Sequence, residues 1–226
     1  MPNEMEALAK TDYLDFDHQV VQEFIRAHIG NEQDKTQIAL KLYYAVRDQI
    51  RYDPYRVEMS VAGLRASSAL EQGYGWCVPK AVLLAACCRA QGIPAKLGFA
   101  DVKNHLTSQR LRESMGTDVF AWHGYTSIFL NGKWLKATPA FNKELCEKAN
   151  IFPLEFTGHE DSIYHEFNRD GQKHMEYMRH RGEFNDLPLQ EMIETFTQLY
   201  NFDQTSDEPV SGNFTNDVEN EVQFDL

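Results

Sequence analysis

Apolar residues recur every three or four positions in four stretches of the chain, which is the spacing of a helix with a buried face. The third of these helices is predicted to follow a glycine turn at residues 73–75. Pro79 lies in its first turn, where a missing N–H group loses no hydrogen bond, and Gly92-Ile93-Pro94 ends it. The four predicted helices cover residues 16–29, 35–50, 77–91 and 187–200, the last with Asp186 as its cap.

A β-hairpin is the strongest short-range signal in the sequence. Asn131-Gly132 is a two-residue turn between alternating stretches, and this dipeptide favours the tight turn of a hairpin. Because such a turn fixes which residues face each other, it pairs Leu130 with Lys133 and places His123 opposite Ala140. The strands of this region are predicted at residues 95–102, 119–130 and 133–138, with a polar loop at 103–118.

These elements predict an α+β fold in three parts. Residues 1–142 form the core with its N-terminal helices, and the helix at 77–91 packs on an antiparallel sheet. Residues 143–202 are expected to form a C-terminal extension, mostly helical with irregular segments, that packs on the core. Residues 203–226 carry acidic residues and no basic ones, which predicts a loosely ordered tail.

Composition narrows the class of protein. The chain has 34 acidic and 22 basic residues and a net charge of −12, which argues against a nucleic-acid partner. The longest apolar run, residues 81–88, is too short to span a membrane. The N-terminus lacks the pattern of a signal peptide, so we expect a cytoplasmic protein. Its four cysteines (Cys77, Cys87, Cys88 and Cys146) are expected to be reduced.

Cys77 and His123 are the candidate catalytic pair. Cys77 opens a predicted helix, where unpaired N–H groups and the helix dipole favour a thiolate. His123 lies on a predicted strand and is a candidate base. The alternative is that both residues merely pack in the core. Together they indicate acyl transfer, with Trp76 and Tyr74 as candidate neighbours of the oxyanion.

A third residue is needed to orient the imidazole ring of His123. The hairpin places Thr138 and Asn142 diagonally across from it. Neither side chain is a carboxylate. Either residue can hold the ring by a neutral hydrogen bond, which would slow the chemistry; alternatively, the site is incomplete and the fold serves another purpose.

Several segments together resemble the transglutaminase-like superfamily. Its members share a papain-like Cys-His-Asp core, which implies Cys77 as nucleophile and His123 as base. The family's aspartate lies four residues after a strand tryptophan, and in this chain Thr138 stands four residues after Trp134. The matching segments are residues 43–53, 75–77, 88–95, 122–125 and 132–134.

The resemblance implies a cysteine-dependent hydrolase, such as a peptidase, or an acyltransferase. Its substrate would be a peptide or protein amide, and the reaction would pass through a thioester. The alternative is a catalytically silent module that binds a peptide or protein partner in the same cleft. Acetyl transfer from coenzyme A, as in arylamine N-acetyltransferases, ranks lower because residues 73–77 do not spell that family's Arg-Gly-Gly-x-Cys turn. The sequence leaves open the substrate, the acyl acceptor, the oligomeric state and the pathway.

Other residues give weaker signals. The chain has no phosphate loop and no dinucleotide fingerprint, so we expect no cofactor. Four histidines near the C-terminus match no zinc or calcium spacing, so we expect no metal and favour surface and packing roles. Tyr43, Tyr44, Tyr52 and Tyr55 are expected to pack in the core and at its rim rather than to form a ligand cage.

Overall fold

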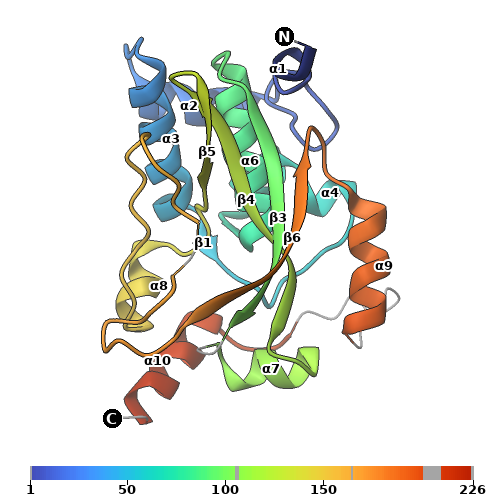
Figure 1. The fold of residues 1–226 in the computed structure, drawn as a ribbon, viewed down its shortest axis with the longest axis vertical. Helices are drawn as coiled ribbons and strands as arrows, with labels where there is room; N and C mark the ends of the chain where they lie inside the picture. The colour runs from blue at the N-terminus through green and yellow to red at the C-terminus, as the bar shows by residue number, and fades with distance from the viewer. Residues whose placement is uncertain (1, 105–106, 164, 201–209, 225–226) are drawn as a thin grey trace.

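The computed structural model describes residues 2–104, 107–163, 165–200 and 210–224. Within them the main sheet has four antiparallel strands in the order β5-β4-β3-β6, and a small sheet pairs β1 with β2 in parallel (Figure 1). The strands are β1 Arg51–Tyr52, β2 Tyr74–Gly75, β3 Ala95–Asn104, β4 Val119–Leu130, β5 Lys133–Ala137 and β6 Met175–Phe184. The helices are α1 Pro2–Glu6, α2 Gln19–Ile29, α3 Lys35–Gln49, α4 Val61–Leu64, α5 Ala66–Gln72, α6 Cys77–Ala90, α7 Gln109–Met115, α8 Lys143–Lys148, α9 Leu189–Leu199 and α10 Phe214–Phe224.

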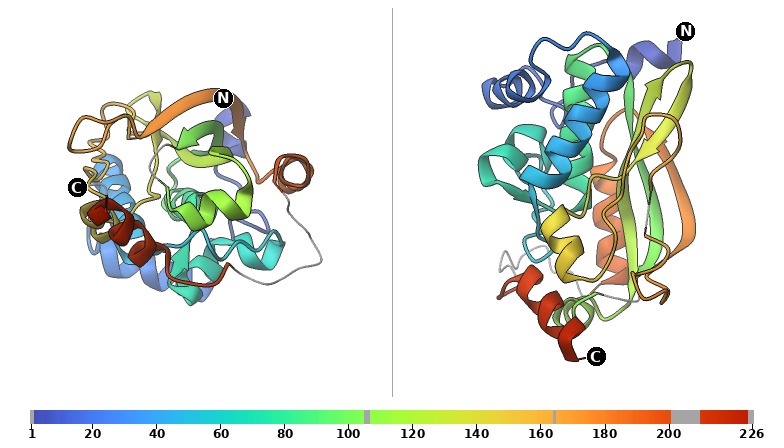
Figure 2. Two further views of the ribbon diagram at one scale, coloured as in Figure 1. Left: turned by 90° about the horizontal axis from the view of Figure 1, so that it is seen from below. Right: turned by 90° about the vertical axis from the view of Figure 1, so that its left-hand side faces the viewer.

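Helix α6 lies between the main sheet and the N-terminal helices, which form a layer on one side of the sheet (Figure 2). Its residues from Cys77 to Arg89 are all buried, which explains why its apolar residues are not confined to one face. The Thr126 hydroxyl of β4 donates to the Ala81 carbonyl of α6 at 2.9 Å. The predicted α+β fold, with the cysteine helix packed on an antiparallel sheet, is confirmed.

Two buried cations anchor the ends of α6. Near its start, the Lys80 ammonium donates to the carbonyls of Arg47 (2.9 Å) and Ile50 (2.5 Å), where α3 ends. Near its end, the Arg89 guanidinium donates to the carbonyls of Ala9, Ala95 and Asn185. These bonds give each buried side chain several carbonyl partners, as buried charged groups require. They also fix the helix relative to the sheet.

The predicted hairpin is present. Asn131 and Gly132 have φ angles of 51° and 83°, as a tight hairpin turn requires. Leu130 pairs with Lys133, as predicted, and the ladder continues to the pair of Thr126 and Ala137. Thr138 therefore lies one residue beyond the end of β5.

The prediction for residues 143–202 is partly wrong. Helices α8 and α9 are present, but β6 adds a ten-residue strand to the edge of the core sheet, antiparallel to β3. Residues 175–184 lack a regular apolar alternation because most of them are only half-buried or exposed, and two register shifts interrupt the pairing. Helix α9 is also preceded by Pro188 without a side-chain cap, rather than capped by Asp186.

The prediction of a loosely ordered tail is wrong for residues 214–224, which form α10; residues 203–209 and 225–226 lie outside the described part. Phe214 and Val218 are buried, and Asp217 forms an ion pair with Arg110 at 2.9 Å. Arg110 belongs to α7, which lies in the segment predicted to be a loop. The acidic residues of the tail find basic partners elsewhere in the fold.

Two further properties bear on the class of protein. In the described residues, no helix combines the length and the apolar character needed to cross a bilayer. All four cysteines are free thiols, and all are buried.

Candidate functional site

Cys77 is the first residue of α6, as predicted. Helix α5 ends at Gly73, whose φ angle of 70° lies in the left-handed region that glycine adopts without strain. Strand β2 follows and pairs with β1, and Trp76 is extended. The thiol is thus placed by a short strand on one side and a long buried helix on the other.

His123 lies on β4 beside an irregularity in the strand. Ala100 of β3 pairs with His123, but Val102 pairs with Phe120, so β4 contains an extra residue at this point. Trp122 has a φ angle of 59°, and its N–H donates to the Asp101 carboxylate at 3.1 Å. Bulges of this kind redirect side chains and are frequent beside active sites. The regular alternation predicted for β4 therefore stops at His123.

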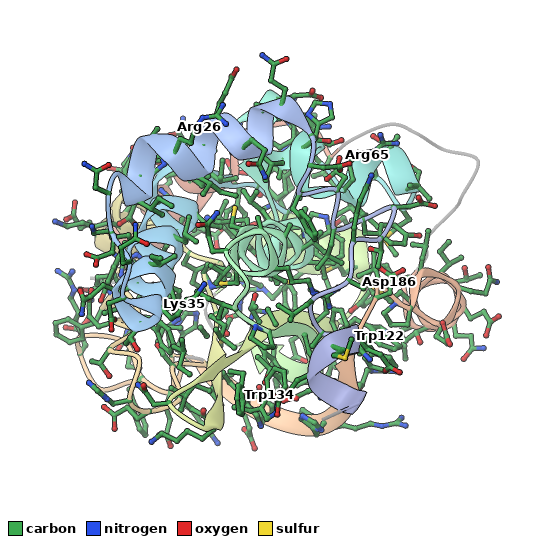
Figure 3. All side chains as sticks on the ribbon, turned by 90° about the horizontal axis from the view of Figure 1, so that it is seen from above. Arg26, Lys35, Arg65, Trp122, Trp134 and Asp186 are labelled. Atoms are coloured by element: carbon green, nitrogen blue, oxygen red, sulfur yellow. The ribbon has the colours of Figure 1, made fainter. Side chains whose placement is uncertain are left out.

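Strand β4 contacts the start of α6 directly after His123. A Cβ atom added to Gly124 would lie 3.2 Å from Cα of Val78 and 3.3 Å from the carbonyl oxygen of Cys77. Glycine lets the strand come this close to the helix. Cys77 thus takes part in this contact between helix and strand, and His123 is the residue directly before it. Figure 3 looks almost along the axis of α6, which lies in the middle of the molecule.

Burial controls the ionisation of both residues. It raises the pKa of Cys77 to about 12, although the N–H groups of Gly124, Val78 and Cys77 itself favour the thiolate. Burial lowers the pKa of His123 to about 4. The sequence-based prediction of a lowered thiol pKa is wrong because only 6% of Cys77 is exposed, and lost hydration outweighs the helix start. At neutral pH the structure holds a thiol and a neutral imidazole.

The two candidate orienting residues have other contacts. Thr138 is buried; its N–H donates to the Ser162 carbonyl, and its carbonyl accepts from the Tyr43 hydroxyl. The Thr138 hydroxyl has no hydrogen-bond partner in the described structure. Asn142 Oδ1 accepts from the N–H of Tyr52 at 3.0 Å. The expected hydrogen bond from Thr138 to the imidazole is therefore not formed in this conformation.

The family model of the transglutaminase-like superfamily matches residues 22–139, just over half of the chain. The chain belongs to this superfamily. The match contains Cys77, His123 and Thr138, and it confirms the resemblance drawn from the sequence. No curated protein matches the sequence.

Solved structures similar to this chain include two candidate proteases and an acetyltransferase. A candidate cysteine protease from Cytophaga hutchinsonii is 17% identical, with a TM-score of 0.47 over 62% of this chain and 42% of that chain. A candidate protease from Parabacteroides distasonis is also 17% identical, with a TM-score of 0.38 over 61% and 26%. The arylamine N-acetyltransferase from Mycobacterium abscessus is 14% identical, with a TM-score of 0.40 over 59% and 46%. The chain therefore aligns with less than half of the length of each.

Trp76 and Tyr74, which were also predicted to belong to the site, lie in different surroundings. The Trp76 ring is buried and lies 6.1 Å from the Phe196 ring of α9. The Tyr74 ring is half-buried, and the guanidinium groups of Arg51 and Arg56 lie over it. Trp76 is thus enclosed by the C-terminal segment, while Tyr74 lies among charged side chains.

His165 and His174, two of the four histidines near the C-terminus, are buried next to the core. The ring of His165 stacks on Phe141 at 5.3 Å and lies 5.7 Å from the ring of His174. Burial, followed by the charges of His174 and His123, lowers the pKa of His165 to about 3. In the described residues, no group of three or more His, Cys, Asp or Glu side chains is arranged to hold a metal ion. No spacing in the sequence predicts this cluster, because its members meet only through the tertiary fold.

Proposed function

We propose that this chain is a cysteine-dependent hydrolase or acyltransferase that acts on an amide or peptide-type substrate. Cys77 is the nucleophile and His123 is the base. The observation that supports the proposal best is the contact of Gly124, the residue after His123, with the first residues of α6. Membership of the transglutaminase-like superfamily supports the same roles.

The ionisation of the two groups defines the first step of the proposed reaction. The Cys77 thiol attacks the carbonyl carbon while His123 accepts the thiol proton, because both groups are neutral before the reaction. A carbon–sulfur bond forms and the carbonyl electrons move to oxygen. The leaving amine then takes the proton from His123, which leaves a thioester on Cys77. Water or an amine releases the acyl group.

The proposed oxyanion site is built from backbone groups. The N–H groups of Cys77, Val78 and Gly124 already act on the sulfur of Cys77. Donors fixed in a buried site stabilise a developing negative charge more than water does. The start of α6 and the neighbouring strand thus supply the groups that acyl transfer requires.

A catalytically silent binding module is the second candidate function. It is favoured by the Thr138 hydroxyl, which has no partner, and by the burial that keeps Cys77 and His123 uncharged. In this case the same part of the fold would hold a peptide or a protein partner without chemistry. The two functions differ in whether Cys77 forms an acyl adduct.

The proposed function predicts that p-nitrophenyl acetate acylates Cys77 selectively. Mass spectrometry should locate the adduct on Cys77, and Cys77→Ser should abolish it. His123→Ala should slow acylation about 10²–10⁴-fold, which is the usual contribution of a general base. Cys146→Ser is the matched control, because Cys146 is another buried free thiol, and it should leave the rate unchanged.

The pH profile gives a second measurement on the same protein. His123 must be neutral to accept a proton, and its pKa is lowered to about 4, so the rate should fall on the acid side only near pH 4. An unperturbed histidine would cause this fall near pH 6.5. Acylation spread evenly over the four cysteines, or none at all, would favour the binding module.

A further inference from the structure

Tyr52 is fixed beside the segment that carries Cys77. It pairs with Gly75 in the parallel ladder of β1 and β2, two residues before Cys77. The N–H of Asp53 donates to the Gly75 carbonyl at 3.2 Å, and the N–H of Tyr52 donates to Asn142 Oδ1 at 3.0 Å. The backbone of Tyr52 is therefore held from both sides.

The ring of Tyr52 is held between two phenylalanines. Phe141 packs against it edge-on, with ring centroids 4.7 Å apart, and Phe214 of α10 does so at 5.6 Å. Only 5% of the residue is exposed. Because aromatic rings so enclosed have few alternative positions, the hydroxyl group is also fixed in place.

The hydroxyl of Tyr52 differs from those of other buried tyrosines. Tyr43 donates to the Leu154 carbonyl, Tyr55 bonds to Ser108 and Asp217, and Tyr200 donates to the Val119 carbonyl. Among the described residues, the Tyr52 hydroxyl has no hydrogen-bond partner. This hydroxyl is also not among the fully enclosed side-chain atoms that lack a partner, so a small part of it reaches solvent. Its donor is therefore free to bind a ligand beside the segment that carries Cys77.

The pKa of Tyr52 fits a role as a hydrogen-bond donor. Burial raises the pKa of Tyr52 well above its ordinary value, and the negative charge of a Cys77 thiolate raises it further. Tyr52 therefore keeps its proton at neutral pH and can act only as a donor toward an anion.

We propose that the Tyr52 phenol is a catalytic residue that donates a hydrogen bond to the oxyanion formed during attack by Cys77. This inference rests on the proposed function. When the carbon–sulfur bond forms, the carbonyl electrons move to oxygen and the thiol proton moves to His123, while Tyr52 keeps its own proton. When the intermediate collapses, the carbonyl re-forms, the amine leaves with the proton from His123, and the hydrogen bond from Tyr52 weakens.

The experiment compares two reactions of Cys77 in the full chain, wild type and Tyr52→Phe. Acylation by p-nitrophenyl acetate forms an oxyanion, whereas alkylation by iodoacetamide displaces iodide and forms none. Removing one oxyanion donor costs about 10²–10³-fold. We therefore expect acylation of Tyr52→Phe to be about 10²–10³-fold slower, with alkylation changed less than about twofold. The variant keeps the ring and both of its aromatic contacts, so the fold is retained.

Tyr55→Phe is the matched control. Tyr55 also packs on Phe214, but its hydroxyl bonds to Ser108 and Asp217. This variant should leave the ratio of acylation to alkylation unchanged. The inference is overturned if Tyr52→Phe also leaves the ratio unchanged, or if it slows both reactions equally, as a packing defect would. If wild-type Cys77 is not acylated at all, the proposed function fails together with the inference.

Discussion

Thr138→Asp is expected to speed the acylation of Cys77 by about 10–100-fold. Thr138 stands where the superfamily resemblance places a carboxylate, and its own hydroxyl has no hydrogen-bond partner. An aspartate there can accept a hydrogen bond from the imidazole and stabilise the imidazolium that forms during attack. Loss of such a carboxylate costs a serine protease about 10⁴-fold. The surroundings of residue 138 in this chain are not adapted to a carboxylate, so the variant should recover only part of this factor.

Two variants at the same position serve as controls. Thr138→Asn adds a neutral side chain of similar size, so it can orient the ring but stabilises the imidazolium less. Thr138→Val removes only the hydroxyl, which has no partner, so the acylation rate should not change. A rate for Thr138→Val well below that of the wild type would mean that the hydroxyl orients His123 during the reaction.

Thr138→Asp should also change the pH dependence of the acylation rate. A carboxylate beside His123 raises the pKa of the imidazole from its value of about 4. The acid limb of the rate profile should therefore move to higher pH than in the wild type. An unmoved acid limb with an unchanged rate would show that residue 138 does not reach the imidazole. The buried carboxylate should also lower the thermal stability when His123 is neutral.

Lys80→Met is expected to change how stability depends on pH. Lys80 is fully buried, and burial lowers its pKa from 10.5 to about 7. Between these two values, the unfolded chain holds a proton that the folded chain has released. The wild type should therefore gain stability as the pH rises from 7 toward 10.5, and below pH 7 the cost of burying the charge is fully present. Lys80→Met removes this contribution.

The measurement is urea unfolding of both proteins at pH 7, 8, 9 and 10. Each unit of pKa shift corresponds to about 1.4 kcal/mol, so the free energy of unfolding of the wild type relative to Lys80→Met should rise by several kcal/mol. Groups common to both proteins, such as the buried cysteines, cancel in this difference. Lys96→Met is the control for the loss of one lysine from a buried position. Parallel curves for wild type and Lys80→Met would contradict the prediction.

The sequence alone determined the parts of the structure that depend on near neighbours. The Asn131-Gly132 turn fixed the hairpin and its register, because few dipeptides adopt two successive positive φ angles. The glycine turn and Pro79 placed Cys77 at the start of α6. The order of these segments was enough to indicate the superfamily.

Only the tertiary structure decided the features that depend on distant segments. Strand β6 belongs to the sheet because it pairs with β3, about 80 residues earlier, and α10 is held by side chains such as Arg110 and Tyr55. The predicted and observed shifts of the Cys77 pKa have opposite signs for the same reason. The helix start by itself lowers the pKa of the thiol, but burial in the folded chain raises it by more. Hydration is a property of the packed molecule, and the sequence around a residue does not reveal it.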